Sequence, residues 1–159
     1  MTDLPPESCW QLPAPFVLTF DVQTADIDAY EHVNNTVYLR WIDAAAWAHS
    51  DAAGMTTDYC KSIERGFAVH RHEIDYIGSA HLGDRVHVAT WITGLDGRLR
   101  SQRRFQIIRE SDLKTLVNAR TVFICTNLKT GKPTRMPPEF KEAYQVDDRV
   151  AAALAAEAA

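Results

Sequence analysis

The chain has 159 residues, of which 46% are hydrophobic and 24% charged, and its formal net charge is −4. This length fits one domain, and the ordinary composition excludes disorder as a description of most of the chain. The mildly acidic balance gives no general electrostatic attraction to nucleic acid or to anionic membranes, so neither is expected as a partner.

No targeting segment is visible. The first residues include Pro5 and Pro6 and lack a basic start followed by an apolar run, so no signal peptide is expected. No apolar run approaches the roughly 18 residues of a membrane span. Three cysteines at irregular spacing, Cys9, Cys60 and Cys125, favour reduced thiols over a disulfide framework. We therefore expect a cytoplasmic protein.

The first expected element is a strand. Residues 1–14 are interpreted as an irregular lead-in. After them, apolar side chains recur at every second position, as a half-buried strand requires: Phe16, Leu18, Phe20 and Val22. A polar stretch over 24–35 follows, and it is too acidic and too rich in turn-forming residues to be core.

A long helix is expected next. Apolar positions recur every three or four residues along 36–53, which predicts a helix of about 27 Å at ~1.5 Å per residue. Asn34 or Asn35 is its expected N-cap, and Gly54 can end it. Its many alanines make the helix slim, so that a sheet can wrap closely around it.

The rest of the chain is predicted to be mainly strands. A short helix is expected over 57–65, and four strands follow it: 67–77, 85–93, 99–109 and 117–125. A last short helix is expected after 137–138. The alanine-rich tail over 147–159 favours helix but is too short to be stable alone. No repeat or linker divides the chain, which indicates one domain over 15–146.

This order of elements predicts an α+β fold. Four consecutive strands joined by short turns favour antiparallel pairing. The simplest burial is one curved antiparallel sheet of about five strands wrapped around the single long helix. Such a sheet leaves an outer face and an edge exposed, so self-association is expected.

The stretch over 26–35 carries the clearest chemical signal. It places two carboxylates, Asp26 and Asp28, together with His32 just before a helix start. A helix start offers unpaired amides and partial positive charge, which suit an oxygen that becomes negative during acyl transfer. A nearby carboxylate can act as base or nucleophile. The alternative is that the same residues only form turns and a helix cap.

A resemblance to a known family favours the catalytic interpretation. The run D-I-D-A-Y-E-H-V-N-N-T-V-Y resembles the D-x-D-x-x-x-H-V-N-N-x-x-Y signature of bacterial acyl-CoA thioesterases. These enzymes belong to the 4-hydroxybenzoyl-CoA thioesterase branch of the hotdog superfamily, and plant acyl-ACP thioesterases share the pattern. The segments 74–76, 83–86 and 130–137 also resemble this family, in the same order along the chain.

The resemblance implies a hotdog fold and roles for individual residues. Asp28 matches the key carboxylate, as general base or nucleophile, and His32 would polarise the carbonyl or orient water. The remaining motif positions are assigned to the pocket and to substrate binding: Tyr30, Asn34, Asn35 and Tyr38. Tyr30 departs from the plant enzymes, which have asparagine there.

Several basic residues are candidates for the phosphates of coenzyme A. Arginine suits phosphate, and the candidates are Arg103, Lys132 and Arg135. A solvated or intersubunit ion-pair surface is the alternative for the arginine-rich run over 98–109. His70, His72 and Glu73 resemble a metal site, but two histidines without a third fixed ligand are weak evidence, so no metal is expected.

The expected activity is hydrolysis of an acyl thioester, from acyl-CoA or acyl carrier protein, to a free acid and a thiol. It requires no cofactor, since CoA is part of the substrate. The resemblance implies a homodimer or homotetramer with each site between two subunits. Two alternatives remain open: a hotdog hydratase or dehydratase, and a hotdog protein that binds acyl-CoA without catalysis.

Overall fold

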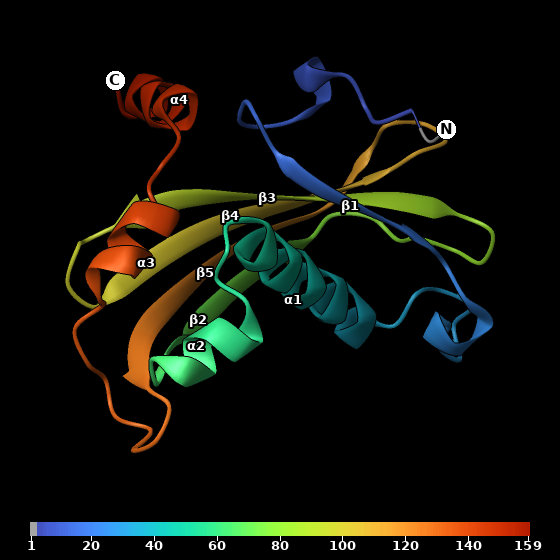
Figure 1. Ribbon diagram of the computed structural model, residues 1–159. Coiled ribbons are helices and arrows are strands. Elements are labelled where there is room, and N and C mark those ends of the chain that lie inside the picture. The colour runs from blue at the N-terminus through green and yellow to red at the C-terminus, as the bar shows by residue number, and fades with distance from the viewer. Residues whose placement is uncertain (1–2) are drawn as a thin grey trace.

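The computed structural model describes residues 3–159, and its main feature is one five-stranded antiparallel sheet (Figure 1). The strands are β1 (Phe16–Asp21), β2 (Arg65–Tyr76), β3 (Arg85–Leu95), β4 (Arg100–Arg109) and β5 (Thr115–Asn127). The helices are α1 (Asn35–Ala52), α2 (Thr57–Ser62), α3 (Pro138–Ala143) and α4 (Asp148–Ala158), with short 3-10 turns η1 (Glu7–Cys9) and η2 (Thr24–Asp26). Within the described residues, no helix is long and apolar enough to cross a membrane.

The sheet curves around α1, which confirms the predicted α+β arrangement (Figure 1). The buried side of α1 presents Trp41, Ile42 and Ala45 to the sheet, as the helical period predicts. Val88 and Phe105 lie in the same core cluster, from the strands opposite. This packing fixes the start of α1 relative to the sheet.

The strand order is β1-β3-β4-β5-β2. The antiparallel prediction is confirmed, but β2 pairs with β5 and not with β3, its neighbour in sequence. The segment over 77–84 joins β2 to β3 and is too long for a two-residue hairpin. It can therefore pass the ends of β5 and β4, which lie between β2 and β3 in the sheet. As a result β2 is an edge strand.

The two ends of the chain cover part of the outer face of the sheet (Figure 1). Trp10 lies edge-on to Trp91 of β3, with 6.3 Å between ring centroids, and Leu12 is buried beside them. Val150 and Leu154 of α4 pack on the same cluster. The alanine-rich tail is therefore a helix that tertiary packing stabilises, and the outer face is less exposed than expected.

Candidate functional site

The loop before α1 folds into a tight turn around Asp28. A bridge between Ile27 and Val33 closes the turn, and the Asp28 amide donates to the His32 carbonyl at 2.9 Å. Asp28 Oδ1 accepts from the amides of Tyr30, at 2.8 Å, and His32, at 3.4 Å. Its Oδ2 has no hydrogen-bond partner among the described residues. One oxygen thus orients this half-buried carboxylate, and the other is available.

Asp26 holds the loop to the helix. Its side chain is buried at 5% exposure, and it accepts from Arg40 of α1 at 2.7 Å and from the Gln23 amide at 2.8 Å. Its carbonyl accepts from the Asn34 amide at 2.8 Å. The two carboxylates of the motif are therefore different: Asp26 is fully engaged in structure, and Asp28 is only partly engaged.

Within the part of the chain that the structure describes, the first amide of α1 has no hydrogen-bond partner. Asn34 is the N-cap, and its Oδ1 accepts from the amide and the hydroxyl of Thr36, both at 2.9 Å. Between the two capping candidates, this geometry selects Asn34. The Asn35 carbonyl accepts from the Tyr76 hydroxyl at 3.1 Å, and the Asn35 amide has no partner among residues 3–159. A free amide here can donate to a ligand oxygen.

The aromatic residues of the motif are placed differently from one another. Tyr30 is 84% exposed, whereas Tyr38 is buried and its hydroxyl accepts from the Ala80 amide at 2.8 Å. The exposed ring of His32 lies edge-on to His81, with 4.9 Å between centroids. Their parts in substrate binding and catalysis stay predictions.

His81 is a residue that the sequence did not reveal. It belongs to the segment between β2 and β3, and the Val33 amide donates to the neighbouring Ala80 carbonyl at 2.9 Å. This contact brings His81 beside His32. No pattern in the chain links two histidines that are so far apart in sequence.

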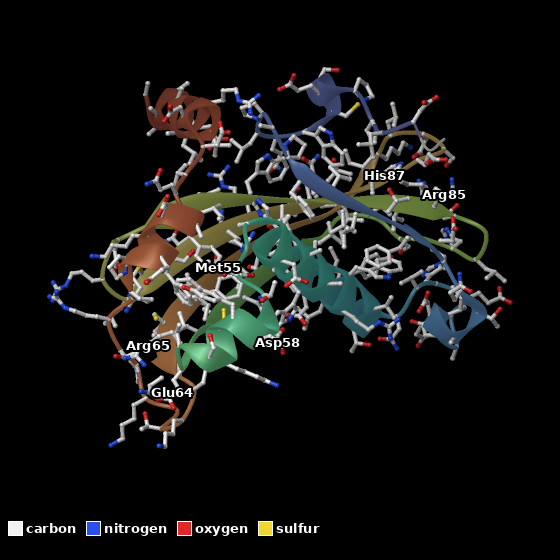
Figure 2. The ribbon with its side chains drawn as sticks, viewed as in Figure 1. Met55, Asp58, Glu64, Arg65, Arg85 and His87 are labelled. Atoms are coloured by element: carbon white, nitrogen blue, oxygen red, sulfur yellow. The ribbon has the colours of Figure 1, made fainter. Side chains whose placement is uncertain are left out.

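A largely apolar cavity of about 450 Å³ lies beside the other end of α1. Figure 2 shows Met55, which lines it, at the same end of the molecule as Glu64 and Arg65, while His87 and Arg85 lie at the opposite end. Its apolar walls come from α1, β2, β5 and the connections after α1 and β5: Ala46, Trp47, Met55, Phe67, Val69, Phe123 and Leu128. Its polar residues include Ser50, Ser101, Arg103 and Tyr144.

The three candidates for CoA phosphates do not form one cluster. Arg103 lies in the core at 3% exposure, facing α1. Lys132 and Arg135 are exposed on the segment that follows β5, and Leu128 of the same segment lines the cavity. Their assignment to phosphate stays a prediction, and burial makes Arg103 the least suitable of the three for a hydrated diphosphate.

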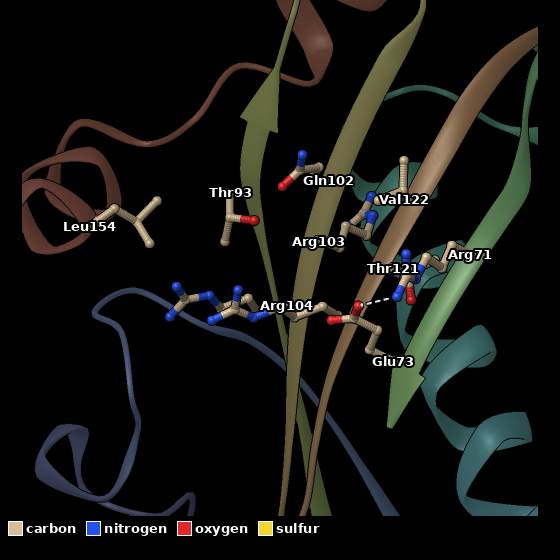
Figure 3. A pocket seen from close by; sticks show the side chains of 10 residues that line it. Arg71, Glu73, Thr93, Gln102, Arg103, Arg104, Thr121, Val122 and Leu154 are labelled. Atoms are coloured by element: carbon tan, nitrogen blue, oxygen red, sulfur yellow. Dashed lines mark ion pairs between the residues drawn. The ribbon is translucent and has the colours of Figure 1, made fainter. Parts of the chain in front are cut away.

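Arg109 of the basic run donates to the Ser79 carbonyl at 2.8 Å and pairs with Asp112 at 2.8 Å, whereas Arg104 faces the outside of the sheet. Figure 3 shows a smaller cavity there, of about 260 Å³, with Arg104 on its wall and an ion pair of 2.8 Å between Arg71 and Glu73. Arg104 also pairs with Glu157 of α4 at 2.9 Å. Arg104 is therefore paired within the chain, and the solvated or intersubunit ion-pair surface stays a prediction for the basic run.

The histidines of β2 do not converge on a ligand. A β-bulge interrupts the pairing of β2 with β5 between Val69 and Arg71, and His72 Nδ1 lies 2.8 Å from Thr121 Oγ1. Over residues 3–159, no group of three or more His, Cys, Asp or Glu side chains is placed to hold a metal ion.

Comparison with known proteins places this architecture in a family. Residues 22–144 match the family described as the thioesterase-like superfamily. The long-chain acyl-CoA thioesterase FadM of Escherichia coli is 29% identical over 120 residues, which cover 73% of this chain and 86% of that protein.

Solved structures show the same fold. The 1,4-dihydroxy-2-naphthoyl-CoA thioesterase Slr0204 of Synechocystis superposes with a TM-score of 0.73 at 22% identity, covering 82% of this chain and 96% of that one. The protein SAV2348 of Staphylococcus aureus, solved in complex with CoA, superposes with a TM-score of 0.76 at 17% identity, covering 82% and 81%. These likenesses confirm the hotdog fold.

Proposed function

Because the chain belongs to the thioesterase-like superfamily, we propose that it hydrolyses acyl-CoA at the turn before α1, with Asp28 as the catalytic carboxylate. Water adds to the thioester carbonyl, the carbon–sulfur bond breaks, and the products are a carboxylic acid and free CoA thiol. The relative FadM is named a long-chain acyl-CoA thioesterase, which supports an acyl-CoA substrate.

One observation carries this proposal. Among residues 3–159, Asp28 Oδ2 has no hydrogen-bond partner while backbone amides orient Oδ1, and the Asn35 amide at the nearby start of α1 has no partner either. A carboxylate can activate water or attack directly, and an amide at a helix start can stabilise the negative oxygen of the tetrahedral intermediate. His32, beside His81, is proposed to orient water or the carbonyl.

Two courses are open to Asp28. As a base it removes a proton from water while the hydroxide forms a bond to the carbonyl carbon. As a nucleophile it forms an anhydride with the acyl group and expels CoA, and water then hydrolyses the anhydride. Label found in Asp28 after a single turnover in isotopically labelled water identifies the second course, because only water that attacks the aspartyl carbon of an anhydride leaves its oxygen there.

We further propose that the active unit is a dimer formed along β2. This edge strand is 12 residues long and pairs with β5 alone among the described strands, and Val69 is 45% and Tyr76 47% exposed. Trp47, on the neighbouring side of α1, is 53% exposed. Antiparallel pairing of two β2 strands about a twofold axis sets the two α1 helices antiparallel. Asp28 of one subunit then faces the cavity end of the other.

The dimer gives the cavity a role in binding the acyl chain. Within one subunit, 15 residues separate Asn35 from Ser50 on α1, about 22 Å at ~1.5 Å per residue. Across the proposed twofold axis the cavity of one subunit comes nearer to the reacting carbonyl at the other. Lys132 and Arg135, exposed near the cavity, are proposed to contact the CoA phosphates.

The test is free-thiol release from short, medium, long and aromatic acyl-CoAs. We expect clear turnover on at least one of them and a preference for long chains. Binding of an acyl-CoA without thiol release would contradict the proposal and favour the non-catalytic alternative. Double-bond change in enoyl-CoA would favour a hydratase instead. Sedimentation of wild type and of a variant with Val69→Lys tests the dimer, which the variant should weaken.

A further inference from the structure

A buried arginine, Arg103, lines the cavity and has no counter-ion among the described residues. Arg103 leaves β4 on the side of α1, and Arg104 leaves it on the opposite side (Figure 3). Arg104 pairs with Glu157, whereas among residues 3–159 no carboxylate lies within ion-pairing distance of Arg103. Burying an uncompensated charge lowers the free energy of unfolding, so packing alone does not explain an arginine at this core position.

The contacts of Arg103 orient its charge without neutralising it. Nη1 donates to His49 Nδ1 at 2.7 Å, Nη2 donates to Ser50 Oγ at 3.2 Å, and the guanidinium lies 5.9 Å from the ring centroid of Tyr144. Burial and then the charge of Arg103 lower the pKa of His49 to about 4, so this imidazole is a neutral acceptor at neutral pH. Burial lowers the pKa of Arg103 to about 10, which leaves it a cation there.

Ser50 adds a second donor at the same place. Its Oγ accepts from Arg103 and from the Tyr144 hydroxyl, at 3.1 Å, so its own hydrogen remains to be donated. Among the described residues the structure gives that hydrogen no acceptor. Arg103, Ser50 and Tyr144 all line the cavity of about 450 Å³. A negatively charged group with two oxygens is what these donors can satisfy together.

We propose that the cavity binds an aliphatic chain that ends in a carboxylate, and that this carboxylate pairs with Arg103 and accepts from Ser50. The apolar walls, including Met55, Phe67 and Phe123, bury the chain, and the planar guanidinium fork matches the two oxygens. The carboxylate has two possible sources. It is either the far end of an acyl group that carries a second acid, which rests on the proposed thioesterase function, or a free carboxylic acid held as an inhibitor.

The first test is calorimetric titration with octanoate, octanol and octylammonium. Wild type is expected to bind octanoate about 10- to 100-fold more tightly than octanol, which is the usual gain from a hydrogen bond to a charged group, with octylammonium weakest. The variant Arg103→Met should lose this preference and still bind octanol. The matched control, Arg104→Met, changes the next arginine on the opposite face and should keep the preference.

Thermal unfolding of each variant shows whether it is folded. If Arg103→Met does not fold, the comparison of octanoate, octanol and octylammonium on wild type is by itself the test of the proposal. Octanol bound as tightly as octanoate by wild type would overturn the proposal. A preference for octanoate that survives in folded Arg103→Met would overturn it as well.

The second test identifies the source of the carboxylate by comparing kcat/KM for dodecanoyl-CoA and for the CoA half-thioester of dodecanedioic acid. If the half-thioester is preferred by wild type and not by Arg103→Met, the carboxylate belongs to the acyl group. If dodecanoyl-CoA is preferred and octanoate inhibits only proteins that retain Arg103, the source is a free acid. No turnover on any thioester would contradict the proposed function, while the titration result would stand.

Discussion

The turn before α1 and the cavity beside α1 are built in different ways. In the turn, Asp28 bonds to Tyr30 and His32, and Asn34 bonds to Thr36, so the side-chain bonds of Asp28 and Asn34 span at most four residues. In the cavity, the bond between Arg103 and His49 spans 54 residues, and the bond between Tyr144 and Ser50 spans 94. The orientation of Asp28 and the cap of α1 are therefore local, whereas the polar contacts of the cavity exist only after the chain has folded.

This difference separates two tasks. The turn offers a carboxylate and a free amide, which are the groups that acyl transfer needs. The cavity offers apolar walls and a buried cation, which are the groups that recognise a chain. Substitutions in the turn should therefore change turnover, and substitutions in the cavity should change which substrate is preferred.

The largest expected effect is at Asp28. Asp28→Asn keeps an acceptor for the amides of Tyr30 and His32 but removes the base or nucleophile, so turnover should fall by about 10²- to 10⁴-fold. Stability and substrate binding should change little. Thiol release measures turnover, and thermal unfolding measures stability. The control Glu31→Gln removes an exposed carboxylate from the same turn and should keep full activity. Near-normal turnover by Asp28→Asn would exclude Asp28 as the catalytic group.

A smaller effect is expected from narrowing the cavity. In Met55→Trp the larger side chain should exclude about two methylenes of a long acyl chain, each worth ~0.8 kcal/mol, and so reduce kcat/KM for long acyl-CoA by about tenfold. Short acyl-CoA should be hydrolysed as before. The control Leu4→Trp adds the same side chain at an exposed, distant site. Equal loss on short and long chains would show that the cavity does not hold the acyl group.

A substitution at Asp26 tests its structural role in holding the turn to α1. Asp26→Asn removes the ion pair with Arg40, so it should lower the free energy of unfolding by about 1–2 kcal/mol, a modest value because the Arg40 side chain is 66% exposed. Urea unfolding measures this loss. Turnover per folded molecule should stay within a few-fold of wild type. A loss as large as that of Asp28→Asn would mean that the two carboxylates share the chemistry.

The last prediction is a pH dependence of stability at His49. Its pKa is about 4 in the folded chain and 6.5 ordinarily, so between these values the unfolded chain binds more protons. The contribution of His49 to the free energy of unfolding is therefore complete above pH 6.5 and is lost as the pH falls towards 4. Urea unfolding between pH 4 and 7 should show a shallower decline for His49→Gln, which keeps an acceptor for Arg103. Burial lowers the pKa of His72 as well, so part of the decline should remain.

Much of the architecture is determined locally and was predicted. Alternating apolar residues give the strands, a three-to-four-residue period gives α1, and Asn34 caps it because its oxygen reaches an amide two residues on. The motif around Asp28 is contiguous, so it could be recognised before the fold was known. The bonds that orient Asp28 and cap α1 span at most four residues, and that is why the sequence by itself could predict this part of the region.

Only the tertiary structure decided the rest. It placed β2 at the edge of the sheet, brought His81 beside His32, and put Arg103 inside and Arg104 outside. It also turned the alanine-rich tail into a helix, packed on Trp10 and Trp91. Each of these outcomes depends on which surfaces meet, since burial free energy comes from contacts between segments distant in sequence. Neither the hydrophobic period nor the spacing of residues along the chain predicts those contacts.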